Sequence, residues 1–195
     1  MESDINVKAK ITSNVQFSDK LLNVIFYVGI IGAIATVLPF VFTIDNDFPF
    51  WTVLQIGEIM TSIAEIVFIS LISYKIYKDG ISKPPYVLLA CFAGIIVLDF
   101  LVELISDEIG TITNFIYIIS SVGAGIILLM SKNTNKIGMW LLLSLAGFII
   151  LFAIIFDEFE NTNKWIGIAL AAIYCYPYSK YLESCQKFLV GDGKE

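Results

Sequence analysis

The sequence contains no histidine and no arginine, and all 12 of its basic residues are lysines. A histidine general base, a histidine metal ligand, an arginine clamp for phosphate and an arginine finger are therefore excluded. Charged residues make up 15% of the 195 positions, against about 25% in an average soluble domain. With 57% hydrophobic residues and a mean hydropathy of +0.83, the composition excludes an ordinary soluble enzyme, a disordered chain and a nucleic-acid binder with a basic surface.

Catalytic and metal-binding motifs are also missing. No nucleophile lies beside a base in the sequence, and neither a phosphate-binding loop nor a zinc motif occurs. We therefore expect a protein that is not an enzyme and that uses no metal or cofactor. The three cysteines, Cys91, Cys175 and Cys185, are odd in number and form no CxxC pair, so we interpret them as small core residues.

What the sequence does contain is a series of long apolar runs. A helix that crosses a bilayer needs about 20 mostly apolar residues, and three charge-free runs meet this length. Three further segments meet it with one or two charges included. We therefore predict an all-α fold, a polytopic membrane protein built as a six-transmembrane-helix bundle. The predicted spans are residues 21–44, 51–74, 85–106, 110–131, 137–156 and 165–181.

This arrangement leaves residues 1–20 and 183–195 as tails on either side of a transmembrane domain, residues 21–182. We expect the last ten residues to be frayed and Pro177 to weaken the end of the sixth helix. With the N-terminus inside, eleven lysines fall on the cytoplasmic side and only Lys164 falls outside, the bias typical of cytoplasmic loops. The preference for lysine over arginine and the many Ile and Asn residues are typical of an AT-rich bacterial gene. We therefore predict a multi-pass protein of the bacterial inner membrane with both termini in the cytoplasm.

Four carboxylates fall inside the predicted spans: Glu58 and Glu65 in the second, Asp99 and Glu103 in the third. An acidic side chain at the centre of a bilayer costs about 2.5–3.5 kcal/mol, so these residues should face protein or water. At about 100° per residue, Glu58 and Glu65 share one face of their helix with Ser62. Asp99 and Glu103 are four residues apart and share a face of the third helix.

The fourth predicted helix adds polar side chains in a common direction, Asn114, Tyr117 and Ser121. If the second and third helices face each other, their carboxyls form a ladder with Glu65 deepest. Protonation, a bound cation or water must relieve the repulsion among four like charges in a low dielectric. We therefore expect an acidic path for a cation or proton in a channel-like or transporter-like protein that forms a homo-oligomer.

Two alternatives stay open at this point. The carboxyls could hydrogen-bond neighbouring helices and serve only to hold the bundle together. Alternatively, the protein is a membrane-embedded anchor or sensor subunit of a stress or phage-defence complex. Its basic inner residues would then contact membrane lipids or a cytoplasmic protein partner, while no nucleic acid is expected. These basic residues are Lys75, Lys78, Lys83, Lys132 and Lys136.

Overall fold

The computed structural model describes residues 17–41, 50–79, 83–105, 110–158 and 164–191. Within these ranges the chain folds into six helices, and each one coincides with a segment for which the sequence predicts a helix. They are α1 (Asp19–Val41), α2 (Phe50–Lys78), α3 (Lys83–Ile105), α4 (Gly110–Met130), α5 (Asn135–Glu158) and α6 (Lys164–Val190). The predicted all-helical fold is confirmed.

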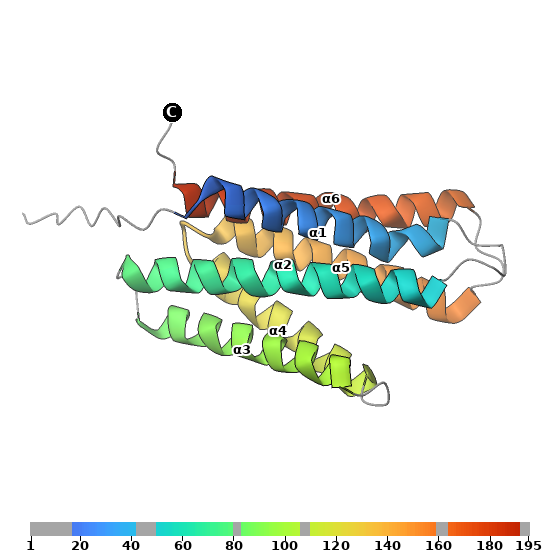
Figure 1. The fold of residues 1–195 in the computed structure, drawn as a ribbon, viewed down its shortest axis with the longest axis horizontal. Helices are drawn as coiled ribbons and strands as arrows, with labels where there is room; N and C mark the ends of the chain where they lie inside the picture. Colours follow the sequence, from blue (N-terminus) through green and yellow to red (C-terminus); the bar gives the residue numbers. More distant parts are fainter. Residues whose placement is uncertain (1–16, 42–49, 80–82, 106–109, 159–163, 192–195) are drawn as a thin grey trace, which may run out of the picture.

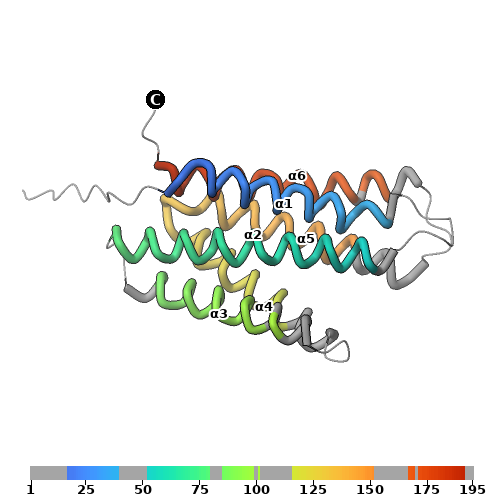
Figure 2. The backbone as a smooth tube through the Cα atoms, in the orientation of Figure 1, coloured from blue at the N-terminus to red at the C-terminus, as the bar shows by residue number. Residues whose placement is uncertain are grey.

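The helices lie side by side in an elongated bundle (Figure 1). Each helix packs against its neighbours in sequence, and α6 returns to pack against α1 and α2. The backbone trace in Figure 2 shows α3 and α4 together on one side of the bundle, with α1 and α6 on the opposite side. Side chains from α2, α4, α5 and α6 therefore meet in the interior.

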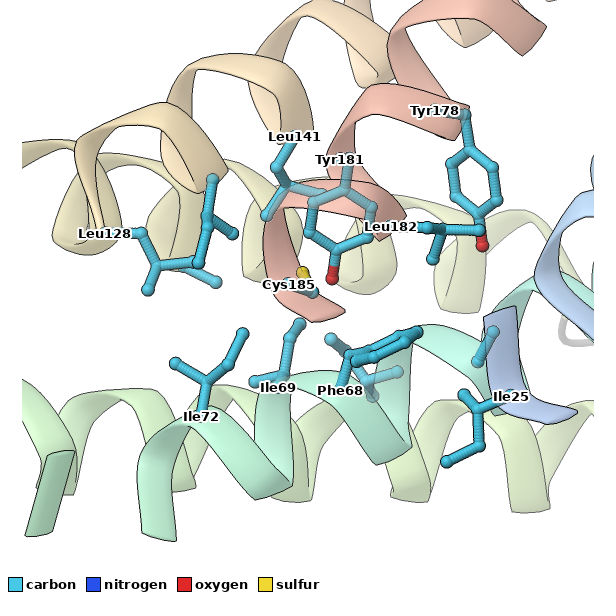
Figure 3. Close-up of a cluster of buried hydrophobic side chains, with 14 of the residues drawn as sticks. Ile25, Phe68, Ile69, Ile72, Leu128, Leu141, Tyr178, Tyr181, Leu182 and Cys185 are labelled. Atoms are coloured by element: carbon cyan, nitrogen blue, oxygen red, sulfur yellow. The ribbon is translucent and has the colours of Figure 1, made fainter. Parts of the chain in front are cut away.

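A close-packed apolar core fills the half of the bundle that holds the C-terminal ends of α2 and α6. Phe68, Ile69 and Ile72 of α2 are fully buried. They lie opposite Tyr181 and Leu182 of α6 (Figure 3). A buried side chain of this size makes some 40–60 atomic contacts of about 0.1–0.2 kcal/mol each, so close packing holds the helices together in water and in lipid alike.

The outside of the bundle is as apolar as its interior. On α1 the outward residues Val24, Tyr27 and Ile31 are more than half exposed, at 60%, 62% and 54%. Within the described residues, Asp19–Pro39 and Thr52–Lys78 are long and apolar enough to cross a membrane. The apolar stretches described in the next three helices are shorter: Pro85–Leu98, Ile116–Met130 and Asn135–Leu151. The structure thus provides two candidate membrane-spanning helices, weak evidence of membrane association, and the six-span arrangement belongs to the proposal below.

The C-terminal end of α6 is longer than the predicted membrane span. The sequence predicts a span that ends at Tyr181 and a frayed end from Gln186, and the helix continues to Val190. Leu182, Cys185 and Leu189 are fully buried in the extra turns, so burial of an apolar stripe holds them in place. The expected fraying of the tail is therefore wrong as far as Val190.

Charged pairs and a glycine complete this end of α6. Lys180 and Lys187 each lie 2.8 Å from a carboxylate oxygen of Glu183, at helical spacings of three and four residues. Their hydrogen bonds, first from Lys180 and then from Lys187, lower the pKa of Glu183 to about 2. Gly191 ends the helix with a φ of 84°, which glycine adopts without a steric penalty, and its N–H donates to the carbonyl of Lys187.

Pro177 lies inside α6 and does not end it. Because proline has no N–H, the carbonyl of Ile173 lacks its usual helical donor. The backbone of α5 covers this carbonyl, since a Cβ placed on Gly147 would lie 2.6 Å from the Ile173 oxygen. Glycine permits this approach and can offer its Cα hydrogens to the carbonyl. The weakening expected at Pro177 is therefore a local break in the hydrogen-bond ladder of a continuous helix.

Candidate functional site

A polar cavity of about 50 Å³ lies between α2, α4, α5 and α6. One water molecule requires about 10–15 Å³, so the cavity has room for a few water molecules or a small ion. The polar side chains that line it are Glu58, Thr61, Ser62, Glu65, Tyr117, Ser121, Ser144 and Tyr174. The cavity therefore combines two carboxyls with six hydroxyls.

Glu65 is the most buried acid of this cavity, with 4% of the residue exposed. The Tyr117 hydroxyl of α4 donates to Glu65 Oε2 at 2.5 Å, the short end of the range for an O–H···O hydrogen bond. This bond joins α2 to α4 in the interior of the bundle. The carboxyl of Glu65 also lines the cavity.

The hydroxyl groups around Glu65 differ in what they can still offer. Thr61 donates to the carbonyls of Gly57 and Glu58, and Ser144 donates to the carbonyl of Leu141. Their oxygens keep lone pairs that can accept. The Ser121 Oγ is buried and has no hydrogen-bond partner among the described residues. A buried hydroxyl without a partner is rare in proteins, so Ser121 indicates a water molecule or ion in this cavity.

The electrostatic character of the cavity is acidic. No lysine occurs among the described residues that line it. Among all the residues that the structure describes, no group of three His, Cys, Asp or Glu residues lies close enough together to hold a metal ion. Carboxylate and hydroxyl oxygens suit protons and hard cations. The arrangement therefore suits a proton or a small hard cation.

Tyrosines of α6 form one wall beside the cavity. The rings of Tyr174 and Tyr178 stack with centroids 5.6 Å apart, and Tyr181 follows with its centroid 5.9 Å from that of Tyr178. The Tyr178 hydroxyl donates to the backbone carbonyl of Thr61 at 3.2 Å. These contacts fix α6 against the face of α2 that carries Glu65.

The structure brings five of the eight acidic-path residues predicted from the sequence to one cavity: Glu58, Ser62, Glu65, Tyr117 and Ser121. The side chains of Asp99, Glu103 and Asn114 lie outside the described residues. The hydrogen-bond partner of Glu65 comes from α4, through Tyr117, which the sequence also predicts on this path.

Sequence reasoning missed the contributions of α5 and α6. Ser144 is the only residue with a hydroxyl in the apolar run 137–156, and this could have marked it as a residue that faces a polar site. Tyr174 was not singled out, because its sequence neighbourhood contains four tyrosines within eight residues and no pattern marks the one that faces the cavity.

Lys75 is a further correction. The sequence predicts that it faces lipid or a partner, but the residue is buried and 8% exposed. Its ammonium donates to the carbonyls of Phe188 at 2.6 Å and Leu189 at 3.3 Å. These carbonyls lie at the end of α6, where helical donors run out, so Lys75 satisfies them. Of the other predicted basic residues, Lys78, Lys132 and Lys136 are exposed, and the side chain of Lys83 lies outside the described residues.

Comparison of the chain with protein-family models, curated proteins and solved structures finds no match. The chemistry of the cavity is therefore the basis for a functional assignment.

Proposed function

We propose that this protein is a small multi-pass membrane protein that binds a proton or a small hard cation at Glu65 and carries it across the membrane. The observation that carries the proposal is the burial of the Glu65 carboxyl in a polar cavity, next to the unpartnered hydroxyl of Ser121. Intramembrane carboxyls of this kind serve proton relays and cation sites. The cavity volume suits a small ion.

The membrane setting belongs to the same proposal. The apolar exterior and the two long apolar helices support it, because a large exposed apolar surface indicates contact with lipid or another protein. We assign a membrane span to each of the six helices and place both termini in the cytoplasm of a bacterial cell. Lys75, Lys132, Lys136 and Lys187 gather at one end of the bundle, which supports that end as the cytoplasmic one.

The mechanism we favour is transporter-like. Glu58 and Glu65 are seven residues apart on α2, a rise of about 10 Å, which is about a third of the bilayer core. All the described residues that line the cavity belong to the middle turns of α2, α4, α5 and α6, so we propose that an ion bound there leaves on the other side through a rearrangement of the helices.

A homo-oligomer also belongs to the proposal. A groove of about 590 Å³ between α2 and α3 is lined by small residues that include Ser70, Ala90 and Gly94. Small residues allow a helix of a second copy to approach closely. The number of copies in the oligomer can be measured from the mass of the protein in detergent, corrected for bound detergent.

The test is a flux assay in proteoliposomes that contain a pH-sensitive dye, repeated with a sodium-sensitive dye. Glu65→Gln keeps the shape of the side chain and removes its charge, so we expect flux to fall to the level of empty vesicles. Glu183→Gln makes the same chemical change on the surface of α6 and should leave the flux intact. Tyr117→Phe removes the hydroxyl that positions Glu65 and should reduce the flux without abolishing it.

Two results would contradict the proposal. If wild-type protein shows no flux and Glu65→Gln elutes as aggregate, the carboxyl serves only to hold the helices together. If wild type shows no flux and all variants fold normally, the anchor or sensor alternative is favoured. Circular dichroism and elution volume report folding in each case.

A further inference from the structure

A second cavity lies at the end of the bundle where the connection from α4 to α5 meets the ends of α2 and α6. It is a groove of about 550 Å³. Four lysines line it, Lys75, Lys132, Lys136 and Lys187, together with small polar side chains such as Ser184. No acidic residue occurs among the described residues that line this groove, which makes it strongly basic.

The backbone adds to this positive potential. Residues 135–137 form the first turn of α5 and line the groove. The first N–H groups of a helix have no intrahelical acceptors and carry a partial positive charge. The C-terminal carbonyls of α6 carry the opposite partial charge, but the buried ammonium of Lys75 accounts for two of them. The described residues that line the groove therefore contribute positive charge and no carboxylate.

Lys132 and Lys136 are the cations most available to a ligand. Both are exposed, and neither forms an ion pair with the residues that the structure describes. Lys187 is 72% exposed at its side chain and shares Glu183 with Lys180. Ammonium donors and hydroxyls around a helix N-terminus are the chemistry that recognises phosphate.

Apolar side chains lie next to the groove in the sequence and face outward. Met130 and Leu129 at the end of α4 are 83% and 45% exposed, and Val190 at the end of α6 is 42% exposed. A soluble phosphate would have no use for this apolar margin, whereas the acyl chains of a lipid would cover it. Lysines at the end of a membrane bundle also reach the headgroup layer of a leaflet.

We propose that this groove binds the phosphate headgroup of an anionic phospholipid, with Lys132 and Lys136 as the principal contacts. The inference requires a membrane protein but does not depend on transport at Glu65, because the two cavities share no lining residue. Failure of one proposal therefore leaves the other standing.

The experiment titrates delipidated protein in detergent with phosphatidylglycerol or phosphatidylcholine of matched chains and counts bound lipids by native mass spectrometry. The double variant Lys132→Gln/Lys136→Gln should weaken phosphatidylglycerol binding by about tenfold or more, because each lysine at a membrane surface is worth close to a factor of five. The control, Lys20→Gln/Lys78→Gln, removes two exposed lysines at the same end, outside the groove, and should bind like wild type. Because both doubles have the same net charge, a difference between them reports the groove.

Three outcomes would overturn the proposal. Equal weakening in the two doubles would mean that the lipid responds only to total charge. Displacement of phosphatidylglycerol by millimolar inorganic phosphate would assign the groove to a soluble anion. Undiminished binding by the groove double would exclude the site altogether.

Discussion

Replacing Lys75 with methionine removes one buried ammonium and keeps most of the side-chain volume. In the native protein this ammonium donates to Phe188 O at 2.6 Å and to Leu189 O at 3.3 Å, and it lies 5.0 Å from the centre of the Phe188 ring. A hydrogen bond to a charged group contributes about 1.5–3 kcal/mol, and the longer second bond contributes less. The cation–π contact adds about 0.5–2 kcal/mol.

Burying the Lys75 ammonium also costs the native protein several kcal/mol of desolvation in an apolar site, and the methionine variant does not have this cost. We expect Lys75→Met to reduce the free energy of unfolding by about 2–3 kcal/mol, the usual result of leaving buried carbonyls without donors. For a chain of this size that corresponds to a fall in Tm of about 4–12 °C. The last turn of α6 should also exchange its amide hydrogens faster, because Lys75 is what ties it to α2.

Thermal unfolding in detergent measures the first effect, and hydrogen exchange of residues 185–190 measures the second. Lys78→Met is the matched control, since Lys78 is exposed one turn further along the same helix. Its replacement removes an exposed cation–π contact, 5.6 Å from the centre of the Tyr74 ring, and should change stability by less than about 1 kcal/mol. Equal melting temperatures for the two variants, with unchanged exchange at the end of α6, would refute the role assigned to Lys75.

The remaining predictions concern α5, α3 and the surface of α6. Gly147→Ala should destabilise the protein by about 1–3 kcal/mol, because its Cβ would press on the Ile173 carbonyl, whereas Gly94→Ala, with no atom within 4 Å of the new Cβ, should be neutral or stabilising in thermal melts. An equal loss of stability in both glycine variants would contradict the close approach of α5 to α6. The ion pairs of Glu183 lower its pKa, so they stabilise the protein fully above about pH 4.5, and this stabilisation is lost as the pH falls towards about 2. Since that side chain is 37% exposed, the difference in melting temperature between wild type and Glu183→Gln should reflect less than about 1 kcal/mol and vanish in acid; a constant difference would show that the pairs contribute nothing.

The helices could be predicted from the sequence because each depends on local properties of its own segment. An apolar run about as long as a bilayer is thick has few stable conformations other than a helix, and lysines and acidic residues divide the runs. The end of α6 was missed because hydropathy falls after Tyr181. Helical spacing still continued there, in the charges at Lys180, Glu183 and Lys187, and it was the better guide.

The candidate site could be predicted only in part. Periodicity places Glu58, Ser62 and Glu65 on one face of α2, and the structure has all three beside one cavity. Periodicity does not say which neighbour that face meets, because the rotation of a helix depends on packing against the other helices. The sequence could therefore offer Tyr117 of α4 as a member of the path, but it could not show that this hydroxyl bonds Glu65.

Lys75 shows the same limit from the opposite direction. The position of Lys75 in the sequence and its positive charge together predict that it lies near the cytoplasmic boundary. Whether a lysine at that depth points outward or inward depends on the end of a helix more than a hundred residues later in the chain. That information is absent from any local pattern.

Pro177 separates two parts of the continuous helix α6, a rod before it and a rod after it. The rod after Pro177 is anchored to α2, through the Tyr178 hydroxyl near the break and through Lys75 at its far end. The rod before it holds Tyr174 against the cavity. A turn that lacks one backbone hydrogen bond bends more easily than the turns around it. The turn at Pro177 is therefore the place in α6 where bending costs least, between the part of the helix that is tied to α2 and the turn that carries Tyr174.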